Sequence, residues 1–105
     1  MFSSVIAEAP GLNHGLAVRG DFLYASSPST VYRWSYVSGQ RTKSNSPEVI
    51  IKNMNSLGCS DCGAPLGHST RTLAFDELGR LYVSVGSEKN VDPDSYRSRI
   101  RRFNL

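Results

Sequence analysis

Residues 71–85 read RTLAFDELGRLYVSV, which predicts two short strands joined by a turn. Apolar and β-branched or aromatic residues fill both halves, and Asp-Glu-Leu-Gly between them is typical of a tight turn. Residues 15–25 read GLAVRGDFLYA and follow the same plan, with Arg-Gly-Asp in the turn. The two stretches match at an offset of about 57 residues. This repeat predicts two copies of one antiparallel unit.

Further strands are predicted after each hairpin. Residues 30–36 and 48–52 are rich in β-branched and aromatic side chains, and residues 99–103 repeat the first of these segments at a larger offset. No segment has a sustained apolar period of 3.6 residues, so no helix is expected. Four short strands per unit are typical of β-propeller blades. The predicted fold class is all-β: a partial β-propeller of roughly two four-stranded antiparallel blades, about residues 14–52 and 70–105, the second incomplete.

Composition limits the possible partners of the chain. Its 105 residues, 39% of them hydrophobic, carry a net charge of +3, which is ordinary for one small domain or a piece of a larger one. Several arginines lie near the C-terminus, but no nucleic-acid recognition motif accompanies them, so no nucleic-acid partner is expected. No apolar run approaches the roughly 20 residues that cross a bilayer. We expect no membrane span; the N-terminus has no signal-peptide pattern, and localisation is unknown.

The predicted strand order shows which loops share an edge. In an antiparallel meander, alternate connections emerge at the same edge of the sheet. The loop that leads into the first strand of a unit, called here its lead-in loop, therefore lies beside the loop between the second and third strands. Both histidines, His14 and His68, lie in lead-in loops. Ligands of propellers gather around the central channel near the first strands, so this edge is the expected site.

The two cysteines, Cys59 and Cys62, form one Cys-Ser-Asp-Cys cluster. A structural zinc site needs about four ligands, and the sequence has no second cysteine pair. Three interpretations stay open: a local disulfide, two ordinary thiols or a redox couple.

Three strings carry a resemblance to a known family. They are GHSTRTLAFD at 67–76, GRLYVSVGS at 79–87 and NHGLAV at 13–18. Together they resemble the pyrroloquinoline-quinone (PQQ)-dependent glucose/sorbosone dehydrogenases, over roughly residues 11–104. The resemblance implies a six-bladed quinoprotein propeller that oxidises a CH–OH group of a sugar or polyol with PQQ as cofactor. The calcium ligands of that family come from later blades, so no metal-binding residue is implied in this chain.

The resemblance also implies roles for single residues. His68 matches the catalytic histidine that removes the hydroxyl proton while hydride passes to the quinone. Asn13 falls near the position of a quinone-contacting glutamine, and His14 is the alternative pocket residue there. Arg71 is suited to an anionic cofactor or substrate oxygen. We therefore expect a cofactor-binding group of Asn13, His14 and Arg71.

Two further residues are expected at the substrate. Ser87 stands where glucose dehydrogenases carry an aspartate that orients the histidine. A serine can hydrogen-bond an imidazole but cannot stabilise an imidazolium by charge. Asn90 matches an asparagine on the same loop of the family. Both are expected substrate-binding residues.

Alternative functions follow from the same fold, because a fold does not determine a function. One is a non-catalytic propeller module that binds a protein or sugar, and the other is a lactonase-like propeller hydrolase. Two blades alone leave apolar faces open, so we expect self-association and no activity from the isolated chain. These open faces are predicted to include Tyr32, Trp34, Tyr82 and Phe103. Members of the family are mostly periplasmic or secreted.

Overall fold

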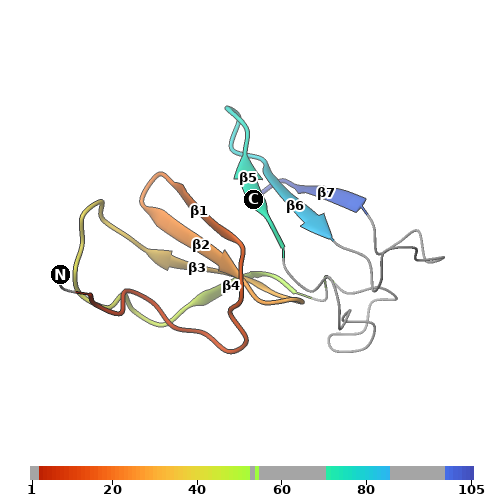
Figure 1. Cartoon of the computed structure of the whole chain (residues 1–105). Coiled ribbons are helices and arrows are strands. Elements are labelled where there is room, and N and C mark those ends of the chain that lie inside the picture. The colour runs from red at the N-terminus through yellow and green to blue at the C-terminus, as the bar shows by residue number, and fades with distance from the viewer. Residues whose placement is uncertain (1–2, 53, 55–70, 86–98) are drawn as a thin grey trace.

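The computed structural model describes residues 3–52, 54, 71–85 and 99–105. Within these ranges the chain forms strands and no helix, and so no helix that could cross a membrane. Strands β1 to β4 form one antiparallel sheet in sequential order, and β5 to β7 form a second (Figure 1). The strands are β1 (Leu16–Arg19), β2 (Phe22–Ser26), β3 (Val31–Ser35), β4 (Glu48–Ile51), β5 (Leu73–Phe75), β6 (Leu81–Val85) and β7 (Arg99–Phe103). The predicted all-β fold, a four-stranded unit followed by a shorter one, is confirmed.

The internal repeat extends to the strand register. Leu23 pairs with Trp34 across β2 and β3 in the first sheet. Leu81 pairs with Phe103 across β6 and β7 in the second. These are the positions that the sequence repeat makes equivalent, so the two units share one hydrogen-bonding plan.

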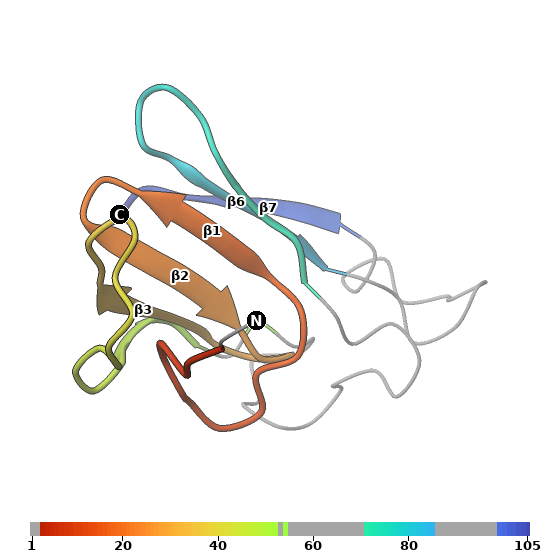
Figure 2. The ribbon, with the colours of Figure 1, turned by 60° about the vertical axis from the view of Figure 1, so that its left-hand side comes forward.

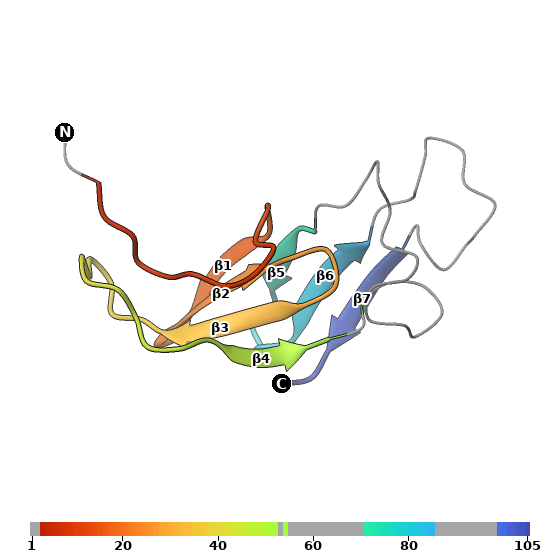
Figure 3. The same cartoon turned by 90° about the horizontal axis from the view of Figure 1, so that it is seen from below.

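The two sheets meet where β1 and β5 lie side by side (Figures 2 and 3). Tyr24 of β2 contacts Phe75 of β5 edge-on, with ring centroids 4.8 Å apart. Such a pair contributes about 0.5–1.5 kcal/mol beyond the area that it buries. The apolar core lies between the sheets and is formed by Tyr24, Val31, Ile51, Met54, Leu73, Leu81 and Val83.

The structure contradicts the prediction that Trp34 lies on an open apolar face. This side chain is only 2% exposed, although it was expected on an open face. Leu23 pairs with it directly, and the ring of Tyr32 lies 6.1 Å from its ring, so its own sheet supplies apolar neighbours. The apolar side chains most exposed on the strands are instead Leu16, Val18, Val49 and Ile100.

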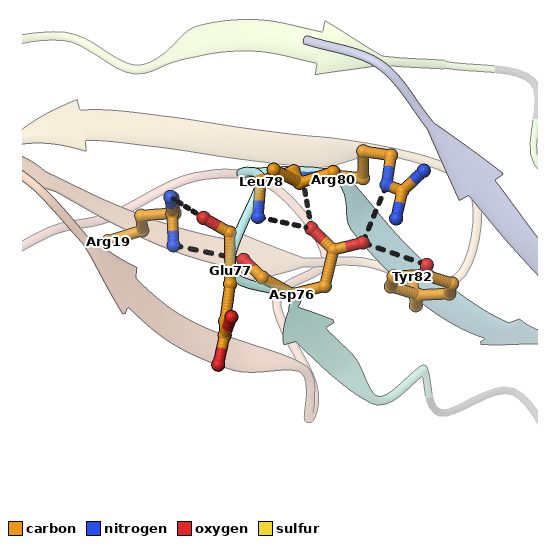
Figure 4. Close-up of polar contacts among 6 residues, drawn as sticks. All are labelled: Arg19, Asp76, Glu77, Leu78, Arg80 and Tyr82. Atoms are coloured by element: carbon orange, nitrogen blue, oxygen red, sulfur yellow. Dashed lines mark hydrogen bonds and ion pairs between the residues drawn. The ribbon is translucent and has the colours of Figure 1, made fainter.

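At the end of the sheets opposite the lead-in loops, Arg19 joins the two units. Its Nη1 donates to the carbonyl oxygen of Asp76 at 3.1 Å, and its Nη2 to that of Glu77 at 3.3 Å (Figure 4). The guanidinium also lies 5.8 Å from the centroid of the Phe75 ring. The first turn is therefore tied directly to the turn of the next unit.

The carboxylate of Asp76 organises the second turn (Figure 4). Its Oδ1 accepts hydrogen bonds from the main-chain N–H groups of Leu78 and Arg80, both at 3.0 Å. Its Oδ2 accepts from Arg80 Nε at 2.6 Å and from the hydroxyl of Tyr82 at 2.9 Å. Desolvation by itself would raise the pKa of Asp76. The hydrogen bonds from Arg80 and Tyr82, together with the charge of Arg80, outweigh it and hold that pKa well below its usual range.

Asp76 is therefore predicted to make stability depend on pH. A carboxyl group whose pKa is lower in the folded chain stabilises the fold above its ordinary pKa of about 4. That contribution is lost as the pH falls through the folded value. We expect Asp76→Asn to lower the thermal unfolding midpoint at pH 7, and the gap to the parent chain to close in acid.

Glu77→Gln is the matched control, because it removes one negative charge from the same turn. Figure 4 shows the Glu77 carboxylate directed away from that of Asp76. Thermal unfolding followed by circular dichroism between pH 2 and 7 measures both variants. If the difference in unfolding midpoint between the parent chain and Asp76→Asn stays constant throughout that range, the explanation is wrong.

Candidate functional site

The lead-in loop of the first unit is anchored to the end of β2. The main-chain N–H of Asn13 donates to the carbonyl oxygen of Ser26 at 3.3 Å, and that of Ser26 donates to the carbonyl of Gly15 at 3.1 Å. These bonds continue the β1–β2 ladder beyond the strand. They place Asn13 and His14, both exposed, at the edge that the strand order predicted.

The two lead-in loops meet at His14. Its ring Nδ1 lies 3.1 Å from the carbonyl oxygen of Arg71, 57 residues further along the chain. Arg71 directly precedes the segment that enters β5, just as His14 precedes β1. Two of the three residues expected to bind a cofactor are therefore in direct contact.

Gly15 makes this contact possible. It is buried, and a Cβ added to it would clash with Ser26 Oγ and lie 2.7 Å from the carbonyl oxygen of Arg71. Any larger residue would push the loop off the main chain of the second unit. A glycine here permits close approach of two backbones.

We expect Gly15→Ala to destabilise the chain by about 1–3 kcal/mol, because the added methyl group overfills a packed contact. Urea unfolding of both chains measures the difference. Gly20→Asn is the control: nothing lies within 4 Å of a Cβ there, and asparagine tolerates the left-handed conformation of Gly20, whose φ is +58°. Equal losses of stability in the two variants would show that the close contacts of Gly15 with Ser26 and Arg71 are not the cause.

Arg71 is completely buried, with 0% of its surface exposed. Burial lowers the pKa of its guanidinium, since the charged form loses hydration. An arginine starts so far above neutral pH that it stays cationic. The segment that leads into β5 therefore carries a buried positive charge.

A small cavity opens beside the loop contact. Its volume is about 200 Å³. Both polar and apolar residues line it, namely Leu12, Asn13, His14, Gly15, Leu16, Ala25 and Ser26. This combination suits a ligand with both hydroxyl groups and C–H surfaces.

Two residues of this region were not predicted from the sequence. The signal for Gly15 was a glycine between a histidine and a strand, a position that often marks close backbone approach. Ser26 follows Tyr24 at the strand period of two, so alternation alone would place it on the buried face. It is 1% exposed, and its hydroxyl has no hydrogen-bond partner among the described residues.

The other expected site residues lie outside the described part of the chain. These are the catalytic candidate His68 and the substrate candidates Ser87 and Asn90, together with Cys59 and Cys62. Their roles stay predictions. Among the residues that the structure does describe, no group of three or more histidine, cysteine or acidic side chains could hold a metal ion.

The fold and the loop contact define a class of protein: an all-β chain of repeated antiparallel units, the plan of a β-propeller, with a polar site at the lead-in loops. The family profile described as TrAA12-like matches residues 2–105, and the chain belongs to that family.

Solved structures agree with this assignment. Two structures of the Trichoderma reesei carbohydrate-active enzyme of family AA12, an iodide and a calcium form, are each 29% identical and superpose with TM-scores of 0.70 and 0.71 over 90% of this chain. The holo form of the pyranose dehydrogenase PQQ domain from Coprinopsis cinerea is 25% identical, with a TM-score of 0.74 over 95% of this chain. The chain spans 24% of the length of each. Among curated proteins, no sequence matches.

These matches confirm the broader part of the expected resemblance, to quinoprotein-like propellers. They extend it to a branch that the sequence strings did not suggest. The resemblance to glucose/sorbosone dehydrogenases rests on the GHSTRTLAFD string at 67–76 and on the similar strand sequences.

Proposed function

We propose that this chain forms part of a PQQ-dependent oxidoreductase that acts on a CH–OH group of a sugar, with His68 as its general base. One observation carries the proposal: the two lead-in loops meet through His14 and the carbonyl of Arg71, whose side chain is fully buried. Membership of the TrAA12-like family and the similarity to the PQQ domain of a pyranose dehydrogenase support it. The isolated chain is proposed to be inactive, since it spans 24% of those proteins.

The described residues fit an anionic quinone. PQQ is a tricarboxylate, and Arg71 carries a positive charge in the segment that leads into β5. The exposed amide of Asn13 could hydrogen-bond a quinone or carboxylate oxygen. When bound, PQQ would supply the hydride acceptor.

The residues of this chain would then handle the substrate proton. His68 would accept the proton of the hydroxyl group that is oxidised, as a neutral imidazole does near neutral pH. Ser87 and Asn90 would orient the sugar by hydrogen bonds. We propose calcium only for the whole protein, in which residues of later blades would bind it.

A domain exchange tests the proposal. Residues of this chain would replace the corresponding quarter of the Coprinopsis cinerea PQQ domain, which aligns with 95% of the chain. We expect PQQ-dependent dye reduction with a pyranose substrate. The unmodified domain is the positive control, and circular dichroism reports folding.

The other functions give different outcomes in the same assay. A folded chimera that binds PQQ but reduces no dye would contradict the oxidoreductase proposal and leave a binding module. A chimera that hydrolyses a sugar lactone without PQQ would indicate the hydrolase.

A further inference from the structure

The hydrogen bond between the lead-in loops fixes the tautomer of His14. A carbonyl oxygen can only accept a hydrogen bond, so in the 3.1 Å contact with Arg71 the ring Nδ1 must carry the proton and donate it. In a neutral imidazole the proton on Nδ1 leaves Nε2 with a lone pair. The neutral ring of His14 can therefore accept a hydrogen bond at Nε2.

The position of His14 makes this acceptor available. The residue is exposed and lines the cavity of about 200 Å³, beside the amide of Asn13 and the apolar side chains of Leu12 and Leu16. A lone pair at Nε2 attracts a hydroxyl group. It repels a carboxylate, which has no proton to donate when ionised.

We infer that His14 belongs to the substrate side of the site: its Nε2 accepts a hydrogen bond from a sugar hydroxyl and does not contact the carboxylates of the quinone. This differs from the cofactor contact that the sequence resemblance suggests for His14. The identity of the ligand rests on the proposed function. The tautomer does not, because it follows from the contact with Arg71 alone.

The tautomer is tested by nitrogen-15 NMR of the full chain labelled at histidine. The chain has only two histidines, so His68→Gln assigns the signals of His14. Magic-angle-spinning spectra serve equally well if the chain associates. At about pH 8.5, where an ordinary histidine is neutral, we expect a protonated Nδ1 and an unprotonated Nε2. The opposite tautomer would overturn the inference.

The ligand is tested with three probes on the same sample. D-glucose should shift the Nε2 signal of His14, whereas PQQ should leave it unmoved. Trimethylamine N-oxide, which has no hydrogen-bond donor, is the control for non-specific effects. A shift with PQQ, or none with D-glucose, would contradict a substrate-side role even if the tautomer is as expected.

His14→Asn separates the structural role of His14 from its binding role. The asparagine amide can still donate to the carbonyl of Arg71 but offers nothing at the place of Nε2. We expect unchanged urea unfolding and loss of the D-glucose response. In the exchanged domain, the same variant should raise KM for the sugar about three- to tenfold, as loss of one hydrogen bond implies, with PQQ content unchanged.

The two proposals can then fail separately. An active chimera whose KM is unaffected by His14→Asn would keep the proposed oxidoreductase and reject the role of His14. An inactive chimera, combined with the expected tautomer and D-glucose shift, would reject the oxidoreductase and leave His14 as a sugar contact.

Discussion

Replacing His68 by glutamine should lower kcat for sugar oxidation by about 10²–10⁴-fold, measured in the domain exchange by PQQ-dependent dye reduction. A general base acts in the transition state, so its loss lowers kcat and kcat/KM together and leaves KM nearly unchanged. Glutamine keeps the approximate size and a hydrogen-bonding end of the histidine side chain, but it cannot take up a proton near neutral pH.

Two controls accompany this prediction. PQQ content, read from absorbance, must equal that of the parent chimera, so that lost cofactor is not mistaken for lost catalysis. Ser69→Ala in the same loop should keep the parent rate. A His68→Gln chimera that retains the parent kcat would remove the assignment of His68 as the base.

Leu81→Ala should destabilise the chain by about 2–5 kcal/mol in urea unfolding. Leu81 is 0% exposed and belongs to the core between the sheets. Removing most of its side chain forfeits apolar burial and leaves a cavity that the rigid sheets cannot close. Because both sheets contribute to this core, the loss should weaken their association as well.

Leu78→Ala makes the same chemical change only three residues away. Leu78 lies in the turn before β6 and is 78% exposed, so we expect a change within about 0.5 kcal/mol. Similar losses in the two variants would mean that the sheets do not pack through Leu81 in solution.

Much of the fold could be predicted because its signals are local. Glycine and aspartate mark the turns, and β-branched and aromatic residues mark the strands, so strands were expected within one or two residues of where they lie. The segment at 71–75 was expected to be extended throughout, but β5 covers only Leu73–Phe75. Arg71 lies before the ladder, where its main-chain carbonyl accepts from His14 instead.

The candidate site could be predicted only in part. The strand order placed Asn13 and His14 at the lead-in edge, because alternate connections of a meander share an edge, whereas Arg71 was expected as the first residue of a strand. No sequence pattern indicated that His14 would bind the main chain of Arg71, or that Gly15 would leave room for this contact. Such contacts depend on how closely two backbones approach, which no local pattern encodes.

The sequence alone determined the strands, the turns and the repeat, since these follow from the backbone preferences of neighbouring residues. Tertiary structure decided which face of each unit is buried. Leu23 and Leu81 are equivalent in the repeat, yet Leu23 is half-buried and Leu81 is fully buried. Tyr24 is buried, whereas its equivalent Tyr82 is half-buried and donates to Asp76. The physical reason is that the two sheets pack through opposite faces, so equivalent residues meet different neighbours.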